Sequence, residues 1–229
     1  MYLCIIPARS GSKRIKNKNI KKFLGYPIIK YSIDAAKKSK LFKKIIVSTD
    51  SAKIKKIALK YGASVPFLRS KKLSDDFTPL VKVLINALKK IDNLPKYFCL
   101  IYAAAPLIDK KDLKKSLSII KKNNSHVDSI LSVCQYSQPI QRALQKNEKN
   151  YLEFVNKKYL FNRSQDLKEM YYDAALFCWF NTDRYLKKNG RNLKTLPYLV
   201  EDNKTQDIDN QRDWKIAQKK FLNLRKNSR

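Results

Sequence analysis

The first half of the chain alternates between short apolar runs and segments whose apolar residues recur at helical spacing. Each apolar run is bounded by polar residues, glycine or proline, as expected for a buried strand, and Asp50 and Ser51 are suited to cap the second helix. Strands that alternate with helices in this way predict right-handed crossovers and a mostly parallel sheet covered by helices on both faces. The predicted strands are residues 2–7, 44–48, 64–68, 97–102 and 128–133. The predicted helices are residues 27–39, 51–61, 78–92 and 109–122.

The pattern changes near residue 135. Residues 135–172 are polar with scattered aromatic residues and carry no long helical pattern, which is unusual inside a compact domain and predicts a functional arm or a subunit contact. Apolar runs that predict two further strands return at 174–180 and 194–200. A last helix is predicted at about 211–222, followed by a frayed basic tail at 225–229.

We therefore expect one α/β domain over residues 1–229, a Rossmann-like three-layer sandwich on a mostly parallel sheet, with an inserted arm at about 135–172. In such sheets ligands bind beyond the carboxyl ends of the strands, so the polar segments that follow strands are the candidate ligand contacts. These segments are residues 8–19, 49–51, 69–78 and 103–109.

Composition excludes several classes of protein. A chain of 229 residues with 44% hydrophobic and 30% charged residues can bury a core, which excludes wholesale disorder. No apolar run reaches the roughly 20 residues of a membrane-spanning helix, and basic residues follow the N-terminal apolar run instead of preceding it, unlike in a secretory signal. Four scattered cysteines without a CxxC pair predict reduced, buried thiols and a cytoplasmic location.

The net charge of +31, from 50 basic and 19 acidic residues, is the unusual feature of the composition. Such a balance raises the question of a nucleic-acid partner. However, 40 of the basic residues are Lys and 10 are Arg, and the lysines occur as pairs along the whole chain instead of in one stripe. We therefore expect no specific nucleic acid and no membrane insertion, and attribute the lysines to a solvated surface or to anionic substrates. A basic nucleic-acid-binding protein stays open as a different class.

The loop that follows the first predicted strand has the chemistry of a phosphate site. Gly11 and the neighbouring serines let backbone N–H groups approach a ligand closely, and several cations surround them. The loop is neither a GxxxxGK[ST] phosphate loop nor a GxGxxG dinucleotide fingerprint, so a basic surface loop is the alternative. The cations are Arg9, Lys13, Arg14 and Lys18.

Asp207 and Asp209 form the second candidate site. In an extended segment, alternate residues point to the same face, so both carboxylates project together while Ile208 packs inward. Two convergent carboxylates suit a divalent metal that also holds phosphates. The alternative is a helix-capping aspartate next to a solvated one. Together with the cationic loop, the pair suggests metal-assisted nucleotidyl transfer.

Residues 6–19, IPARSGSKRIKNKN, resemble the signature of the acylneuraminate cytidylyltransferases, the enzymes that couple CMP to sialic and related acids. The resemblance covers nearly the whole chain. The PIQRA, RSQD and TQDID segments are most similar to the branch that acts on pseudaminic acid. The further segments that carry the resemblance are residues 46–50, 58–63, 65–69, 73–78, 139–143, 162–166, 171–174 and 205–209.

The resemblance implies that the anomeric hydroxyl of a nonulosonic acid attacks the α-phosphate of CTP and releases pyrophosphate. It also implies that Asp207 and Asp209 hold Mg²⁺ and that, with Lys13, they serve catalysis. The residues that would hold CTP are Ala8, Arg9, Ser12, Lys13, Lys18, Asn19 and Arg69.

The same resemblance implies a homodimer. Residues 135–172 match the family's arm, which crosses to a second subunit and completes its site. Within the arm, Arg142, Arg163 and Gln165 are the candidate contacts for the carboxylate and N-acyl groups of the acid sugar.

The chain departs from the family pattern at two places. Pro79 and Leu80 stand where relatives commonly carry Gly and a small hydroxyl residue, and Ala175 and Leu176 stand where the pseudaminic branch reads Gly-Gln. Loss of the Gln amide removes a donor and an acceptor that an apolar side chain cannot replace. Other outcomes therefore stay open: N-acetylneuraminic or legionaminic acid as substrate, more remotely the octulosonate, or a homologue that binds CTP without turnover.

Overall fold

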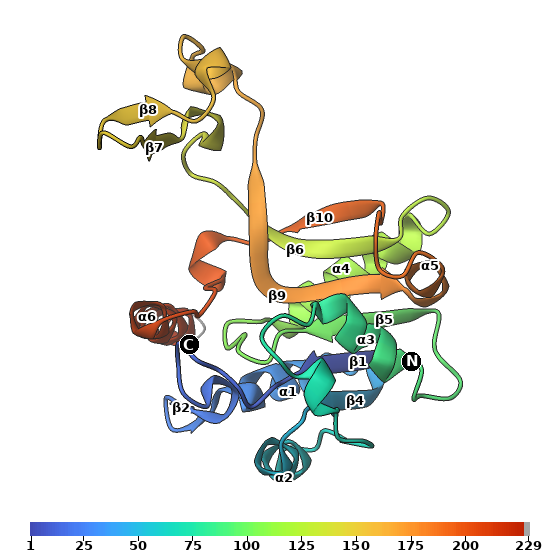
Figure 1. Cartoon of the computed structure of the whole chain (residues 1–229). Helices are drawn as coiled ribbons and strands as arrows, with labels where there is room; N and C mark the ends of the chain where they lie inside the picture. The colour runs from blue at the N-terminus through green and yellow to red at the C-terminus, as the bar shows by residue number, and fades with distance from the viewer. Residues whose placement is uncertain (227–229) are drawn as a thin grey trace.

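A computed structural model describes residues 1–226 and shows a six-stranded sheet between layers of helices (Figure 1). The strand order is β10-β6-β9-β5-β1-β4. Neighbouring strands are parallel except at β9, which runs antiparallel to β5 and β6. The predicted fold class, a mostly parallel α/β sandwich, is therefore confirmed. The strands are β1 (Tyr2–Pro7), β4 (Phe42–Ser48), β5 (Tyr97–Ile101), β6 (Ser129–Gln135), β9 (Tyr171–Asn181) and β10 (Thr195–Leu199).

Helices cover both faces of the sheet because each presents an apolar stripe to it. On one face α1, α2 and α4 share a core that includes Ile33, Ala58 and Leu113. On the other face α3 and α5 bury Leu84 and Tyr185. Within the described part of the chain, no helix is both long and apolar enough to cross a membrane. The helices are α1 (Ile28–Ser39), α2 (Ala52–Lys60), α3 (Leu80–Leu88), α4 (Lys110–Lys122), α5 (Thr182–Lys187) and α6 (Gln211–Lys226).

A third apolar cluster joins the two candidate sites. It buries Ile15 of the first loop together with Ile208, which stands between the two aspartates. Phe23, in the small hairpin of β2 (Lys22–Phe23) and β3 (Tyr26–Pro27), packs in the same cluster against Trp214 of α6, with ring centroids 5.6 Å apart. Two segments far apart in the sequence are therefore fixed to each other by a common core.

Residues 64–68 do not form the strand that the sequence predicts. The segment runs beside β4 but contributes isolated bridges and no continuous ladder. Pro66 lies in its centre and has no N–H to donate, which interrupts the hydrogen bonding that a strand needs. The bridges pair Ile46 with Ser64 and Thr49 with Leu68.

Several helix boundaries also differ from the sequence expectation. Helix α3 is shorter at both ends than the predicted 78–92, and α5 was not predicted. Helix α6 continues through Lys226, so the expectation of a frayed tail beginning at Arg225 is wrong. The remainder of that predicted tail, residues 227–229, lies outside the described residues.

The segment from 135 to 172 forms an arm that projects away from the sheet where β6 ends and β9 begins (Figure 1). It contains a hairpin of β7 (Leu144–Lys146) and β8 (Leu152–Phe154) and short 3-10 turns, and its described residues form no α-helix, as predicted. The arm exposes large apolar side chains, among them Phe161 at 93% of its surface. Such exposure in a small, extended element is typical of an interaction surface.

Strand β9 bends where the arm joins the body. Its first residues pair with β6, and its later residues pair with both β5 and β6. Ala175 lies at the bend with a φ of 52°, a left-handed conformation that favours glycine. The carboxylate of Asp173 accepts a hydrogen bond from the Ala175 N–H at 2.8 Å and so closes the turn.

Candidate active site

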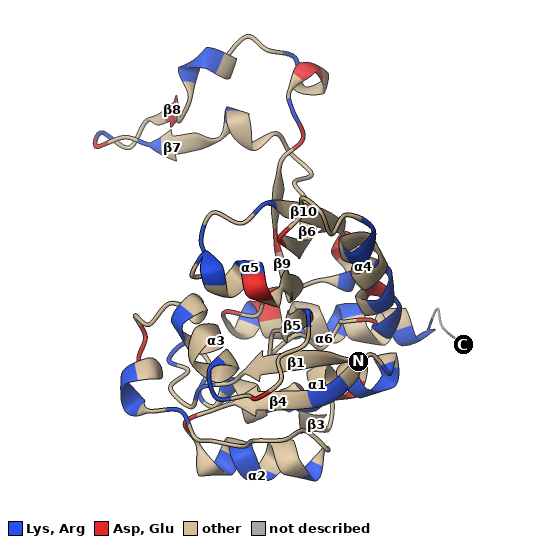
Figure 2. Cartoon of the chain, turned by 90° about the vertical axis from the view of Figure 1, so that its right-hand side faces the viewer, with Lys and Arg blue, Asp and Glu red and all other residues tan. Residues whose placement is uncertain are grey.

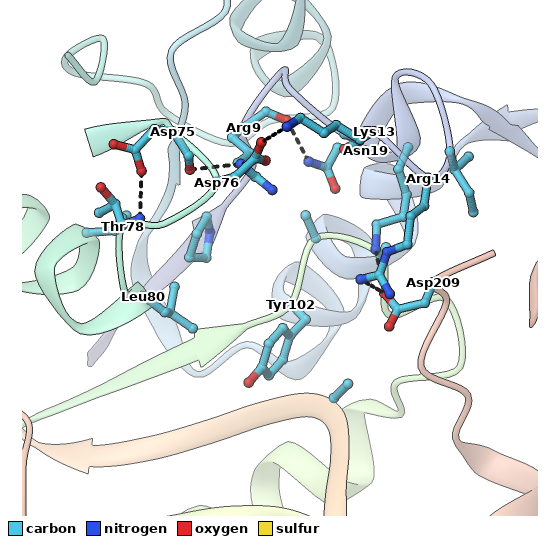
Figure 3. A pocket seen from close by; sticks show the side chains of 18 of the residues that line it. Arg9, Lys13, Arg14, Asn19, Asp75, Asp76, Thr78, Leu80, Tyr102 and Asp209 are labelled. Atoms are coloured by element: carbon cyan, nitrogen blue, oxygen red, sulfur yellow. Dashed lines mark hydrogen bonds and ion pairs between the residues drawn. The ribbon is translucent and has the colours of Figure 1, made fainter. Parts of the chain in front are cut away.

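A cavity of about 330 Å³ opens at the carboxyl ends of β1 and β5 (Figure 3). Three of the segments predicted as ligand contacts, 8–19, 69–78 and 103–109, contribute to its lining. Asp207, Asp209 and Ala175 lie on the remaining wall. The structure therefore brings the basic loop and the acid pair to one place.

The loop after β1 is supported from beneath by polar contacts. Ala8 is buried, and its N–H donates to the carbonyl of Ser48 at 2.9 Å, so it supports the loop without lining the cavity. The carboxylate of Asp50 accepts hydrogen bonds from the N–H and the hydroxyl of Ser10, at 2.9 and 2.6 Å. Helix α2 is capped by the hydroxyl of Ser51, so the expectation that Asp50 shares this cap is wrong.

Two polar residues of the same loop face the cavity. Asn19 is mostly buried, and its side-chain N–H donates to the carbonyl of Arg9 at 2.9 Å, which fixes the backbone beside the first cation. Ser12 lines the cavity, and its N–H donates to the carbonyl of Ser10 at 2.9 Å. These hydrogen bonds therefore fix the conformation of the loop that carries the cationic side chains.

The acid pair has the predicted alternation. Ile208 is buried, while Asp207 and Asp209 line the cavity. A carboxylate oxygen of Asp209 lies 2.8 Å from a guanidinium nitrogen of Arg14 and 3.7 Å from Nζ of Lys18 (Figure 3). The same Lys18 Nζ donates to the carbonyl of Ile208 at 2.6 Å. The cationic loop and the acidic segment are therefore joined by direct contacts.

The acidic segment is anchored on both sides. The buried hydroxyl of Thr205 donates to the carbonyl of Ala174 at 2.5 Å, which ties the segment to the bend of β9. On the other side Asn210 accepts hydrogen bonds from the N–H groups of Arg212 and Asp213 in the first turn of α6. Neither Asp207 nor Asp209 is therefore the cap of this helix.

The electrostatics of the acid pair suit a cation. Desolvation raises the pKa of the Asp207 carboxyl, and repulsion from Asp209 raises it further. Carboxylate oxygens are the ligands that Mg²⁺ prefers, and such an ion commonly takes the rest of its ligands from phosphate and water. Asp207 and Asp209 therefore fit as a partial ligand set. Residues 1–226 contain no group of three or more His, Cys, Asp or Glu placed to hold a metal by themselves.

Arg69 lines the same cavity and is 6% exposed. Its Nε donates to the hydroxyl of Ser74 at 3.1 Å, and its backbone N–H donates to the carbonyl of Thr49 at 2.8 Å. Burial lowers the pKa of its guanidinium group. Its Nη2 is buried and has no hydrogen-bond partner among the described residues. An unpaired buried donor beside a cavity suits an acceptor on a ligand.

The structure adds cavity residues that the sequence did not single out as site residues. Tyr102 lies just beyond β5, and its hydroxyl donates to Asp173 at 3.0 Å. Burial is the main reason why the pKa of this hydroxyl is raised. Its position as the last residue of a predicted strand, at the end where ligands bind in such sheets, was the signal that could have identified it. The other additions are Asp75, Asp76 and Thr78. Arg14, Leu80 and Ala175, which the sequence had already pointed out, also line the cavity.

The residues that depart from the family pattern lie in different surroundings. Leu80 and Ala175 line the cavity, so these substitutions alter its wall. Leu176 is 1% exposed and packs in the main core, so the substitution at this position affects packing in this chain.

The three residues predicted to contact the acid sugar lie in the arm and do not line the cavity of their own chain. A guanidinium nitrogen of Arg142 lies 3.4 Å from the hydroxyl of Ser164, and Arg163 forms an ion pair with Asp166 at 2.7 Å. Gln165 lines a shallow hollow at the base of the arm. Within one chain the structure does not bring these residues to the basic loop.

Five cations and four carboxylates line one cavity at the carboxyl edge of a mostly parallel sheet. Cations for the phosphates beside carboxylates that can hold a metal are the charge pattern that a nucleoside triphosphate requires. The same fold occurs in a solved structure, CMP:2-keto-3-deoxy-manno-octonic acid synthetase complexed with CTP. It superposes with a TM-score of 0.71 over 98% of this chain and 100% of the other, at 13% sequence identity. At that identity the likeness shows the fold alone.

The chain belongs to the cytidylyltransferase family, because the sequence model of that family matches residues 3–225. It is 38% identical to a pseudaminic acid cytidylyltransferase of Campylobacter jejuni over 224 residues, which cover 94% of each chain. It is also 36% identical to a CMP-N,N'-diacetyllegionaminic acid synthase of Legionella pneumophila over 131 residues, 56% of each chain. The predicted family resemblance is therefore confirmed.

Proposed function

We propose that this chain transfers CMP from CTP to the anomeric hydroxyl of a nonulosonic acid, with pseudaminic acid as the preferred substrate. The observation that carries the proposal is that Arg9, Lys13 and Lys18 share one cavity with Asp207 and Asp209 in a cytidylyltransferase. The similarity over nearly the whole length to a pseudaminic acid cytidylyltransferase supports the choice of sugar.

The basic loop would bind the triphosphate. Arg9, Lys13 and Lys18 supply the charge, and Ser12 and Asn19 supply polar contacts and a fixed turn. Arg69 would direct its unpaired Nη2 to an acceptor on the base or ribose. Ala8 would act through the backbone beneath the loop. This arrangement would distinguish a nucleotide from a simple anion, because one cavity offers cations to the phosphates and the Arg69 donor to the base or ribose.

Asp207 and Asp209 would hold Mg²⁺, which supplies charge neutralisation and orientation to the phosphate oxygens when it is bound. For the second carboxylate to serve in this way, Asp209 has to exchange its contacts with Arg14 and Lys18 for a new partner. The two cations released from Asp209 then become available to phosphate oxygens.

The chemistry asks the protein for positioning and charge stabilisation. The hydroxyl oxygen bonds to the α-phosphorus, the bond from that phosphorus to the oxygen of the leaving pyrophosphate breaks, and the hydroxyl proton passes to water. Lys13 and Arg9 would stabilise the negative charge that develops on pyrophosphate. These two cations, together with the acid pair in the same cavity, would orient the triphosphate.

The sugar site is completed by a second copy of the chain in this proposal. Arg142, Arg163 and Gln165 would reach the neighbouring cavity from the arm, because they lie outside the cavity of their own chain. The exposed apolar side chains of the arm, including Phe161, support a homodimer in which they are covered.

The positive charge does not gather over one face. Lysines and arginines are spread over the helices and the arm (Figure 2), as on a solvated surface. This distribution supports small anionic substrates over a polynucleotide, whose backbone requires a continuous basic track. We place the enzyme in the cytoplasm, where CTP is made and its buried thiols stay reduced.

The test is product formation from CTP, Mg²⁺ and a panel of acid sugars: pseudaminic, legionaminic and N-acetylneuraminic acids and the octulosonate. Mass spectrometry would identify the CMP-sugar, and pyrophosphate release would give its rate. We expect pseudaminic acid to have the highest kcat/KM. A preference for legionaminic acid would retain the reaction and change the sugar, while no product with any acid would contradict the proposal.

A further inference from the structure

Asp76 occupies the cationic wall of the cavity (Figure 3). One of its carboxylate oxygens lies 2.6 Å from a guanidinium nitrogen of Arg9, and the other lies 2.5 Å from Nζ of Lys13. The same Arg9 nitrogen also donates to the backbone carbonyl of Asp75 at 2.8 Å. A carboxylate therefore takes the position of an anion on the two cations that the proposed function assigns to the leaving pyrophosphate.

The loop that carries Asp76 is held as one unit. The carboxylate of Asp75 accepts the backbone N–H groups of Phe77 and Thr78, at 3.0 and 2.6 Å. The hydroxyl of Thr78 donates to the carbonyl of Lys72 at 3.0 Å, which closes the loop at its base. Asp76 therefore contacts the cations from a turn whose conformation is fixed by hydrogen bonds.

The same loop also contacts Arg69, another residue of the cavity lining. Ser74, which precedes the two aspartates, accepts the Nε hydrogen bond of the buried Arg69. A movement that withdraws Asp76 from the cations would therefore also shift Ser74 and its hydrogen bond with Arg69. The ion pairs of Asp76 and the placement of the Arg69 guanidinium are therefore linked through one short segment.

The ion pairs of Asp76 can open readily. The Lys13 side chain is 80% exposed and that of Asp76 is 28% exposed, and exposed ion pairs are weak in water. Hydrogen bonds from Lys13 and Arg9 hold the pKa of the Asp76 carboxyl below its usual range, so it is charged at neutral pH. A triphosphate, with more negative charge, can replace this single carboxylate on both cations.

We propose that Asp76 is a positioning residue that holds Arg9 and Lys13 at the pyrophosphate end of the cavity between turnovers. It is displaced when CTP enters, and it forms its ion pairs again as pyrophosphate leaves. This inference rests on the proposed function. The exchange involves ion-pair partners alone, with no covalent step.

The test compares Asp76→Asn with the wild-type chain by calorimetric titration of inorganic pyrophosphate. Asn keeps the shape and removes the competing charge. We expect pyrophosphate to bind about three- to tenfold more tightly, the range that two exposed ion pairs account for. Pyrophosphate should also become a stronger product inhibitor by a similar factor. Asp34→Asn on α1 is the matched control, because it removes an acid paired with Lys30 away from the cavity, and it should leave both values unchanged.

A reporter variant tests the movement itself. Phe77 lies beside Asp76 and is 91% exposed, so Phe77→Trp should fold normally and report on the loop by fluorescence. We expect its emission to change on addition of pyrophosphate to the wild-type background and to change much less in the Asp76→Asn background. Unchanged or weaker pyrophosphate binding by Asp76→Asn, or a silent reporter, would overturn the inference.

These outcomes are separable from those of the proposed function. Pyrophosphate binding that responds to Asp76→Asn, in a chain that turns over none of the acid sugars, supports the inference and contradicts the proposed reaction. Turnover of pseudaminic acid with pyrophosphate affinity unchanged by Asp76→Asn supports the reaction and overturns the inference.

Discussion

Arg14 and Asp209 lie 195 positions apart in the sequence, and both line the cavity, where they are joined by an ion pair of 2.8 Å. Beneath them Ile15 and Ile208 are buried in the same apolar cluster. Each charged residue is therefore adjacent in sequence to an isoleucine that packs in a common core. Hydrophobic packing sets the relative position of the basic loop and the acid pair, and the ion pair orients the two side chains toward each other.

Ile208→Ala should destabilise the fold and weaken the site together. Ile208 is 1% exposed, and truncation of a buried Ile costs about 2–4 kcal/mol of the free energy of unfolding. Urea denaturation followed by circular dichroism measures this loss. Leu59→Ala on α2, where the side chain is 51% exposed, is the control and should change stability by less than about 0.5 kcal/mol. Equal effects of the two substitutions would show that the third cluster does not anchor the acid pair.

Ala175→Gly should raise the stability of the fold. Ala175 holds a φ of 52°, which costs a non-glycine residue about 1 kcal/mol. Part of that gain is lost because glycine is more flexible in the unfolded chain, so we expect a net gain of about 0.5 kcal/mol. Ala175→Val should instead lower the free energy of unfolding by more than about 1 kcal/mol, because a β-branched residue tolerates this conformation least. The same denaturation experiment measures both, and a loss of stability in the glycine variant would refute this view of the bend.

Arg69→Lys should affect CTP binding more than turnover. The guanidinium group donates to Ser74 with Nε and keeps Nη2 free, and a lysine ammonium cannot make both contacts from one position. We expect KM for CTP to rise about tenfold while kcat changes by less than about threefold. Steady-state pyrophosphate release at varied CTP separates the two. A fall in kcat with KM unchanged would place Arg69 at the reacting phosphate instead of at the base or ribose.

Phe161→Asp should convert a homodimer into monomers. Phe161 is 93% exposed on the arm, so a charged residue there is tolerated by the isolated chain but not by an apolar interface. Sedimentation velocity measures the change. Phe77→Asp is the matched control, because Phe77 is 91% exposed but lies in the loop beside the cavity, and it should leave the oligomeric state unchanged. A wild-type chain that sediments as a monomer would remove the arm's proposed role in the neighbouring site.

The sheet and the basic loop could be predicted because their signals are local. An apolar run such as residues 2–7 reports its own burial, and the loop after it follows directly in the sequence. The alternation of Asp207, Ile208 and Asp209 likewise predicts its own geometry. Pro66 is the exception among the strands, because one missing N–H decides whether an otherwise apolar segment joins a ladder.

The contacts between loops could not be predicted in the same way. The pairing of Asp76 with Arg9 and Lys13, and that of Asp50 with Ser10, depend on which loops meet at the sheet edge. Strand β9 runs antiparallel between β5 and β6, and its apolar pattern does not indicate this direction. These features follow from the tertiary arrangement, which hydrophobic periodicity does not specify.

If the cavity shared by the basic loop and the acid pair carries out CMP transfer, loss of one of its carboxylates should slow the reaction. The most direct measurement is the rate of pyrophosphate release from CTP, Mg²⁺ and pseudaminic acid by the wild-type chain and by Asp209→Ala, with Asp34→Ala as the control. We predict that Asp209→Ala loses about a hundredfold or more in kcat, because it removes one of the two carboxylates proposed to hold Mg²⁺ at the triphosphate. The control should retain the wild-type rate. Turnover by Asp209→Ala at a rate close to that of the wild type would contradict the assignment of CMP transfer to this cavity.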